Sequence, residues 1–155
     1  MKRNKKCPSD QARNYAFLLL KFRPRSISEI TARLKAKRYN PLVIKETVDF
    51  LKEKKILNDT QFARAWIDSR LNCAMGFNRI RSELALKGID KKVVDHALAD
   101  IKDEYSESKV VKELAEKRIT RLKDIEPARA KKRVFGYLAR RGFNLETITD
   151  VLEQL

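Results

Sequence analysis

Apolar residues recur at spacings of three and four along most of the chain, which is the pattern of amphipathic helices. The pattern also repeats itself. A shift of 50 residues carries five apolar positions onto five others, and a further shift of 54 carries these onto a third set. The three sets are Ile30, Leu34, Ile44, Val48 and Leu51; Ile80, Leu84, Val94, Leu98 and Ile101; and Val134, Leu138, Ile148, Leu152 and Leu155. Because self-similarity at such a period is typical of repeat proteins, the sequence predicts three copies of one helical unit.

A short connector joins the last two predicted helices of each copy. In the middle copy Gly88 suits the left-handed conformation that ends a helix, and Asp90 suits the cap that starts the next one. Gly142 holds the equivalent place in the third copy, but the first copy has Arg38 there. A left-handed arginine costs on the order of 1 kcal/mol, so the first connector either bears this cost or has a different shape.

The fold class that follows is all-α, a tandem array of three three-helix units that is elongated and curved. A unit of about 50 residues buries only a marginal core, so neighbouring units are expected to share contacts. Four glycines and four prolines supply few of the turns that an all-β protein needs. We expect a flexible basic arm at residues 1–8 and three-helix units at residues 9–57, 58–103 and 104–155.

Polar residues that favour helix starts stand between the apolar stretches. The first helix is expected to begin near Ser9-Asp10 and to turn Phe22 toward a core. Ser26 with Glu29 three residues later has the pattern of a capping box that opens the second helix. In the third unit the first helix is expected at residues 108–122, where the match to the other copies is poorest.

The chain carries a formal net charge of +15, and most of the excess lies in residues 1–57. A field of this sign attracts phosphate or acidic protein before any contact forms. Charge alone does not separate a nucleic acid, an acidic protein surface and a membrane surface, and many basic helical proteins simply keep their lysines solvated. The charge therefore indicates an anionic partner without identifying it.

Basic side chains crowd the second predicted helix of every unit. The helix expected at residues 128–141 carries six of them without an acidic residue, and their mutual repulsion favours an anionic partner. Second helices in series would form a discontinuous basic stripe along the array. The candidate binding residues are Arg33, Lys35, Lys37, Arg70, Arg79, Arg81, Lys87, Arg129, Lys131, Lys132, Arg133, Arg140 and Arg141. A solvated face is the alternative for each, and for Arg70 a structural ion pair within its own unit.

Patterns for catalysis and metal binding are sparse in the sequence. His96 is the single histidine, the four glycines are too scattered for a phosphate-binding loop, and no carboxylates have the spacing of metal ligands. Cys7 and Cys73 match no metal or redox spacing, which indicates reduced thiols in a cytoplasmic protein. The longest apolar run, Tyr15–Leu20, is far too short to span a bilayer. We expect a monomeric binding protein, with no cofactor, metal or membrane partner, rather than an enzyme.

Several of these residues together resemble a known family. The stretch at residues 58–70, NDTQFARAWIDSR, and the residues that follow it are similar to the central signature of the RecX regulatory proteins. Further matching residues are Gly76, Arg79, Ile80, Glu83, Leu84, Lys87, Gly88 and Ile89 in the middle, Ala12, Tyr15, Ala16, Leu19, Arg23, Pro24, Arg25, Ser26 and Glu29 before it, and Arg141, Gly142 and Phe143 after it. The resemblance covers residues 12–155 and departs from the family pattern at Arg38 and at residues 104–127.

The resemblance to RecX proteins implies a non-enzymatic modulator of the RecA recombinase. Such a protein binds the RecA filament on single-stranded DNA and inhibits its ATPase and strand-exchange activities, which modulates recombination and DNA repair. The array would lie in the helical groove of the filament, with its basic stripe facing acidic protein or the single-stranded DNA, and bare DNA is a further possible partner.

Two other functions are weighed against this one. A helix-turn-helix protein that binds duplex DNA directly is the alternative from a different class, because short helix pairs with glycine turns also suit the major groove. A nuclease-like enzyme would need metal-dependent cleavage, which no residue pattern supports.

Overall fold

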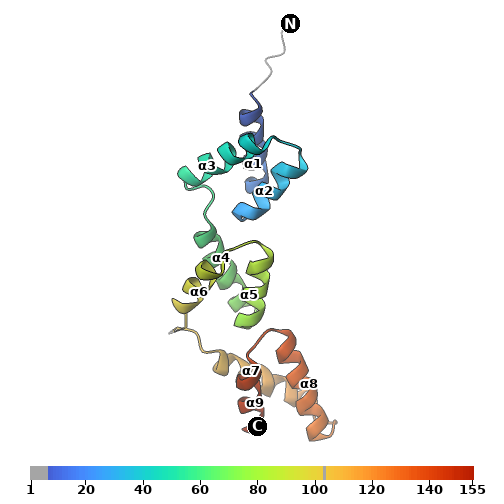
Figure 1. The fold of residues 1–155 in the computed structure, drawn as a ribbon. Helices are drawn as coiled ribbons and strands as arrows, with labels where there is room; N and C mark the ends of the chain where they lie inside the picture. The colour runs from blue at the N-terminus through green and yellow to red at the C-terminus, as the bar shows by residue number, and fades with distance from the viewer. Residues whose placement is uncertain (1–6, 103) are drawn as a thin grey trace.

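The computed structural model describes residues 7–102 and 104–155 of the chain, so most of the basic arm expected at residues 1–8 lies outside the described residues. The described residues form helices and no strands. The helices are α1 (Pro8–Phe22), α2 (Ile27–Ala36), α3 (Pro41–Glu53), α4 (Asp59–Asn72), α5 (Phe77–Leu86), α6 (Lys91–Ala99), α7 (Glu107–Thr120), α8 (Pro127–Arg140) and α9 (Leu145–Glu153). They follow one another down an extended column, with α1, α2 and α3 at one end and α7, α8 and α9 at the other (Figure 1).

Each successive set of three helices encloses its own hydrophobic core. Helices α1, α2 and α3 contact one another, as do α4, α5 and α6, and α7, α8 and α9. Leu34, Leu84 and Leu138 are fully buried at equivalent positions of the three cores. The prediction of an all-α tandem array of three three-helix units is therefore confirmed.

Two residues predicted to face a core are exposed instead. Leu155 is 43% exposed because α9 ends at Glu153, before the chain reaches it. Phe22 is 76% exposed, whereas Ala12 and Ala16 of the same helix are fully buried. At 3.6 residues per turn Phe22 lies about 240° around α1 from Ala16, so its side chain leaves the face that meets the core. Both predictions are wrong.

The helix starts follow the predicted capping residues closely. Ser26 Oγ accepts from Glu29 N and Glu29 Oε2 accepts from Ser26 N, both at 3.1 Å, which confirms the capping box. α1 begins at Pro8, just before the predicted start, and α7 begins within one residue of its predicted position. The side chains that cap α3, α4, α6 and α9 belong to Asn40, Asn58, Asp90 and Asn144.

All three connectors have the same backbone shape, including the one without glycine. The φ angle is 62° at Arg38, 72° at Gly88 and 83° at Gly142. In each connector the following amide bonds to the carbonyl five residues before it, as from Tyr39 N to Leu34 O at 3.3 Å. This is the hydrogen-bond pattern of a Schellman motif. Of the two alternatives for the first connector, the structure has the left-handed arginine.

Arg38→Gly is expected to raise the free energy of unfolding by about 0.5 to 1 kcal/mol, because glycine removes the left-handed strain at a smaller entropic cost. Urea denaturation followed by circular dichroism measures the change. Arg33→Gly, at an exposed position inside α2, is the matched control and is expected to lower the same free energy by about 1 kcal/mol. Equal destabilisation by both changes would contradict the strained geometry at Arg38.

The connector of the second unit packs against the start of α2 in the first unit. Ser26 Oγ donates to Lys87 O at 2.6 Å across this junction. A Cβ added at Gly88 would collide with the side chain of Ser28. Glycine is therefore needed here for close packing as well as for its backbone conformation.

The junction between the second and third units is built in the same way. Gly76 N donates to Arg141 O at 2.8 Å, and Asn78 N donates to Gly142 O at 3.1 Å. A Cβ on Gly142 would collide with Arg79, and one on Gly76 would collide with the backbone of Gly142. The first connector tolerates arginine because Arg38 is exposed and, among the described residues, this connector forms no backbone hydrogen bond to another unit.

An acidic residue at the start of each following unit strengthens these junctions. Asp59 Oδ1 accepts from Ile27 N at 2.9 Å, and Glu107 Oε1 accepts from Phe77 N at 2.6 Å. Each carboxylate thus caps the first amide of the second helix in the unit before it. Burial raises the pKa of both carboxyl groups. The repeated contacts give both junctions the same geometry and so set the direction in which the units stack.

Candidate partner-binding surface

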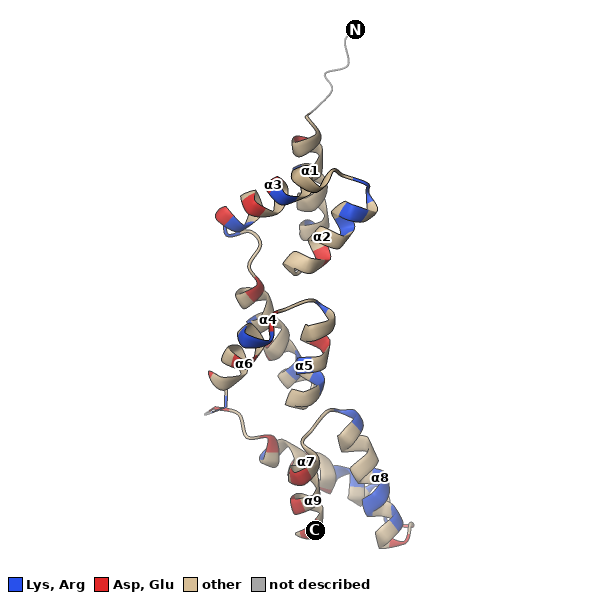
Figure 2. Cartoon of the chain, in the orientation of Figure 1, with Lys and Arg blue, Asp and Glu red and all other residues tan. Residues whose placement is uncertain are grey.

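The second helices of the three units, α2, α5 and α8, lie on the same side of the column (Figure 2). Lysine and arginine gather most densely on α8, which has no acidic residue, whereas α9 beside it has acidic residues and no basic one (Figure 2). The junctions produce this alignment. One joins the start of α2 to the connector after α5, and the other joins the start of α5 to the connector after α8. The basic second helices are therefore presented in series.

The basic residues of α8 form one exposed face. Arg129, Lys132, Arg133 and Arg140 are exposed, and their side chains form no hydrogen bond or ion pair with any residue that the structure describes. At 3.6 residues per turn these positions fall within about 100° of the helix surface, around Gly136. A Cβ added at Gly136 would meet only the Arg140 guanidinium, at 3.2 Å. The face is open and uncompensated, which suits phosphate or carboxylate groups.

Two other basic residues predicted for this surface are used inside the fold. Lys131 Nζ donates to Leu152 O at 2.8 Å, which ties α8 to α9. The Arg141 guanidinium donates to Cys73 O at 2.7 Å and to Ala74 O at 2.9 Å, across the junction between the second and third units. These two side chains stabilise the array and are less available to a partner.

A second basic cluster lies on α7 beside α8, and the sequence reasoning missed it. The Arg118 guanidinium stacks over the Tyr137 ring at 4.0 Å. Lys117, Arg118, Arg121 and Tyr137 line a pocket of about 220 Å³. The repeat could not reveal these cations, because residues 104–127 match the other copies poorly. Their spacing within one turn of a single helix was the signal that the sequence contained.

The cations of the middle unit are largely held by a carboxylate. Glu83 accepts from Arg70 Nε at 2.6 Å, from Arg79 Nε at 3.0 Å and from Trp66 Nε1 at 3.0 Å. Burial would raise the pKa of Glu83, but these bonds outweigh it and lower that pKa. Arg70 also stacks over the Trp66 ring at 4.4 Å. The ion pair weighed as the alternative for Arg70 is therefore present in the structure.

Lys87 lies in a similar cluster at the first junction. Its Nζ is 3.2 Å from Glu29 Oε1 and 4.3 Å from the centre of the Trp66 ring. Glu29 also accepts from Arg23 at 2.9 Å and from Ser26 N at 3.1 Å. Burial would raise the pKa of Glu29, but the bonds from Arg23, Ser26 and Lys87 lower it to about 2. Lys87 therefore joins the first two units electrostatically.

Glu29→Gln is expected to lower the free energy of unfolding by about 2 kcal/mol at neutral pH, because glutamine keeps an acceptor for Ser26 N but loses the charge that binds Arg23 and Lys87. Folding lowers this pKa from 4.5 to about 2, so the stabilisation is complete above pH 4.5 and is lost as the pH falls toward 2. Urea denaturation at several pH values measures both effects. Glu53→Gln, at an exposed position, is the control, and a similar loss in both variants would contradict the account.

The structure divides the predicted binding residues into two groups. Those with exposed side chains and no hydrogen bond or ion pair to the described residues are Arg33, Lys35, Lys37, Arg129, Lys132, Arg133 and Arg140. Those bonded within the fold are Arg70, Arg79, Arg81, Lys87, Lys131 and Arg141. The first group lies at α2 and α8, so the unpaired part of the stripe is found at the two ends of the column. Its role in binding stays a prediction.

Residues 7–102 and 104–155 contain no group of three or more His, Cys, Asp or Glu side chains that could hold a metal ion. Within these ranges no helix has the length and apolar character needed to cross a bilayer. Cys7 and Cys73 are exposed free thiols, and His96 is exposed on α6.

Three three-helix units in tandem, with aligned second helices and repeated junctions, define the chain as a helical repeat protein. Three sequence models of one family match it in the same order. They describe the first three-helix domain of RecX at residues 12–51, the second at residues 58–98 and the third at residues 106–152. The chain belongs to the RecX family of regulatory proteins.

Relatives with that name are similar over most of the chain. "Regulatory protein RecX" of Mycobacterium sp. (strain JLS) is 34% identical over 148 residues, which cover 92% of this chain and 80% of the relative. The protein of the same name from Clostridium botulinum (strain Alaska E43 / Type E3) is 30% identical over 128 residues, which cover 81% of this chain and 59% of the relative. The crystal structure of RecX from Lactobacillus salivarius has the same fold, with a TM-score of 0.85 and 22% identity over 96% of both chains.

Proposed function

We propose that this regulator binds the filament that the RecA recombinase forms on single-stranded DNA. Binding inhibits the ATPase and strand-exchange activities of the filament and thereby modulates recombination and DNA repair. The protein acts as a cytoplasmic monomer and by binding alone, without a catalytic step, cofactor or metal.

The observation that carries this proposal is the unpaired basic surface at both ends of an extended array. Arg33 and Lys35 belong to α2, and Arg129 and Arg133 belong to α8, and these two helices lie on the same side of the column (Figure 2). In the middle unit between them, Arg70, Arg79 and Arg81 are bonded to acids. Two cationic ends separated by the middle unit suit a long anionic partner better than a small ligand.

A filament on DNA is such a partner, because it presents protein carboxylates and nucleic acid phosphates along one axis. An array lying in its groove would occupy the path by which a duplex enters for strand exchange. It would also contact more than one protomer and so oppose the changes that accompany ATP hydrolysis. Inhibition then follows from occupancy and needs no reactive group.

Filament activity in the presence of the chain tests the proposal. Adding the protein to recombinase-coated single-stranded DNA is expected to lower both ATP hydrolysis and strand exchange, with the same dependence on concentration. Unchanged rates at concentrations that saturate binding would contradict it.

Direct binding of duplex DNA is the second candidate function. It is favoured by α8, a single helix of 14 residues with one continuous cationic face, which has the dimensions of a helix that enters the major groove. The sequence of α8 lacks Asn and Gln, the side chains that read adenine in that groove. The lysines and arginines of α8 would contact phosphates, and side chains of these two types also read guanine in that groove.

A further inference from the structure

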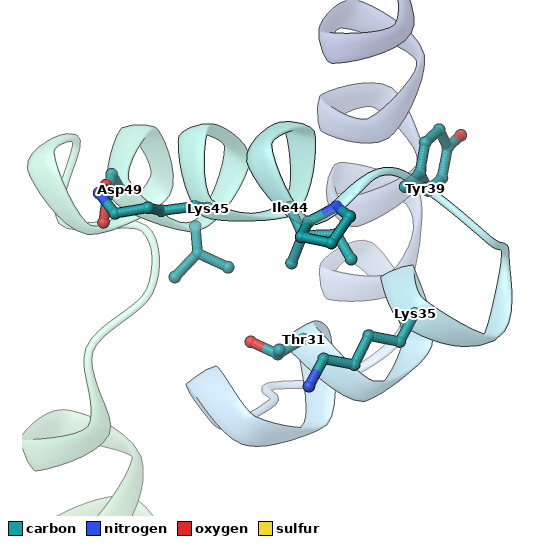
Figure 3. A pocket seen from close by; sticks show the side chains of 8 residues that line it. Thr31, Lys35, Tyr39, Ile44, Lys45 and Asp49 are labelled. Atoms are coloured by element: carbon teal, nitrogen blue, oxygen red, sulfur yellow. Dashed lines mark hydrogen bonds and ion pairs between the residues drawn. The ribbon is translucent and has the colours of Figure 1, made fainter.

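The first unit carries an apolar groove between its second and third helices. Thr31 and Lys35 of α2 lie opposite Ile44 and Val48 of α3 across a groove of about 450 Å³ (Figure 3). Tyr39, in the connector between the two helices, also contributes to its lining. Val48 and Tyr39 are half-buried, so apolar surface is accessible there to a partner.

The third unit has a groove of about 290 Å³ between α8 and α9. The shifts that superpose the units also superpose the residues that line the two grooves. The equivalent pairs are Thr31 and Phe135, Lys45 and Thr149, Val48 and Leu152, and Asp49 and Glu153. The groove is therefore a property of the repeated unit and occurs at both ends of the column.

The middle unit is different at the same place. Arg81 stands in the position of Thr31, and Asp95 stands in the position of Lys45. Arg81 Nε lies 3.4 Å from Asp95 Oδ1, so an ion pair joins α5 to α6. The middle unit, with this ion pair across the groove position, thus lies between the first and third units, whose grooves lack the ion pair.

Each groove also has an unpaired lysine at its edge. Lys35 and Lys132 line the two grooves, and their exposed side chains form no hydrogen bond or ion pair with the part of the chain that the structure describes. The other lysines are engaged, since Lys45 bonds to Asp49 at 2.7 Å and Lys131 bonds to a backbone carbonyl of α9. The two lysines occupy different positions of the repeat, since Lys132 is equivalent to Ser28, so an apolar side chain with carboxylates on both sides of it would complement either groove.

We propose that the two grooves dock the same element, an apolar side chain flanked by carboxylates, on two protomers of one filament. This inference rests on the proposed function, because a filament presents one element repeatedly along an axis. Once the first groove is occupied, docking of the second becomes intramolecular and raises the overall affinity. Each groove alone is then weak, and both are needed for tight binding.

Closing one groove at a time tests the inference. Thr31→Arg with Lys45→Asp installs the ion pair of the middle unit in the first groove, and Thr149→Trp places a large side chain in the groove of the third unit, which the half-buried Phe135 also lines. Each variant is expected to bind recombinase-coated single-stranded DNA at least about tenfold more weakly than the wild type. Lys92→Gln, at an exposed position of α6, removes the same net charge as the paired change and should bind normally.

The possible outcomes are distinguishable. Normal affinity in both groove variants, with circular dichroism showing that they fold, would overturn the inference. Failure of the wild-type chain to bind the coated strand would instead refute the proposed function. An equal loss of affinity for bare single-stranded DNA would assign the grooves to nucleic acid, and a wild-type dimer that the variants dissociate would assign them to a second copy of the chain. Either result overturns the proposed occupant.

Discussion

Reversing the four unpaired cations of α8 is expected to weaken binding to the recombinase filament at least about tenfold, which corresponds to about 1.4 kcal/mol. The changes are Arg129→Glu, Lys132→Glu, Arg133→Glu and Arg140→Glu. None of these side chains is bonded to a described residue, so the fold should survive. Lys131 is left unchanged because it ties α8 to the carbonyl of Leu152. Filament ATPase inhibition, measured against protein concentration, gives the loss directly.

The control for this variant carries the same change in net charge on another side of the column. Lys52, Lys54, Lys91 and Lys92 are exposed at α3 and α6, away from the row of second helices (Figure 2). Reversing these four should alter inhibition only slightly, through the long-range field. Equal loss in both variants would mean that net charge matters and the α8 face does not.

Gly76→Ala is expected to lower the free energy of unfolding by about 3 kcal/mol, because the added methyl group would collide with the backbone of Gly142 and Phe143. Its backbone conformation is not the cause. The φ angle of Gly76 is −79°, which alanine adopts easily. The loss therefore reports the close packing of the second unit against the third. Urea denaturation measures it, and hydrogen exchange should show the earliest opening at this junction.

Gly136→Ala is the matched control for that prediction. Gly136 lies inside α8, and a methyl group there would meet only the flexible end of Arg140. Alanine should therefore stabilise the chain by up to about 1 kcal/mol through its helix propensity. Stabilisation by both changes, or no effect of Gly76→Ala, would show that the junction is looser than the structure has it.

The fold could be predicted from the sequence because its determinants are local. Apolar spacing places Leu34, Leu84 and Leu138 in three equivalent cores, and short capping patterns place the helix starts. The failures came at helix ends, where Phe22 and Leu155 continue the apolar pattern beyond the helix face or the helix end that would bury them. A periodic apolar pattern does not show where the helix ends or where its face leaves the core.

The candidate surface was predicted less completely, because its state depends on residues far apart in the chain. Lys87 bonds to Glu29 across 58 positions, and Arg141 bonds to Cys73 across 68. No local sequence pattern reveals such pairs. From the sequence alone, a basic residue that joins two units cannot be distinguished from an unpaired basic residue on the surface. The fold also gives a second reason for glycine in the second and third connectors. Gly88 and Gly142 pack closely against the preceding unit, where a Cβ would collide.

Recognition of a recombinase-coated strand by the extended basic array is the central proposal. Its most direct test compares the affinity of the chain for three ligands, which are recombinase-coated single-stranded DNA, bare single-stranded DNA and bare duplex. The measurements are made at about 50 and about 200 mM salt, because phosphate contacts weaken steeply over this range. The account predicts that the coated strand is bound most tightly and that its affinity depends least on salt, and tightest binding to the bare duplex would contradict it.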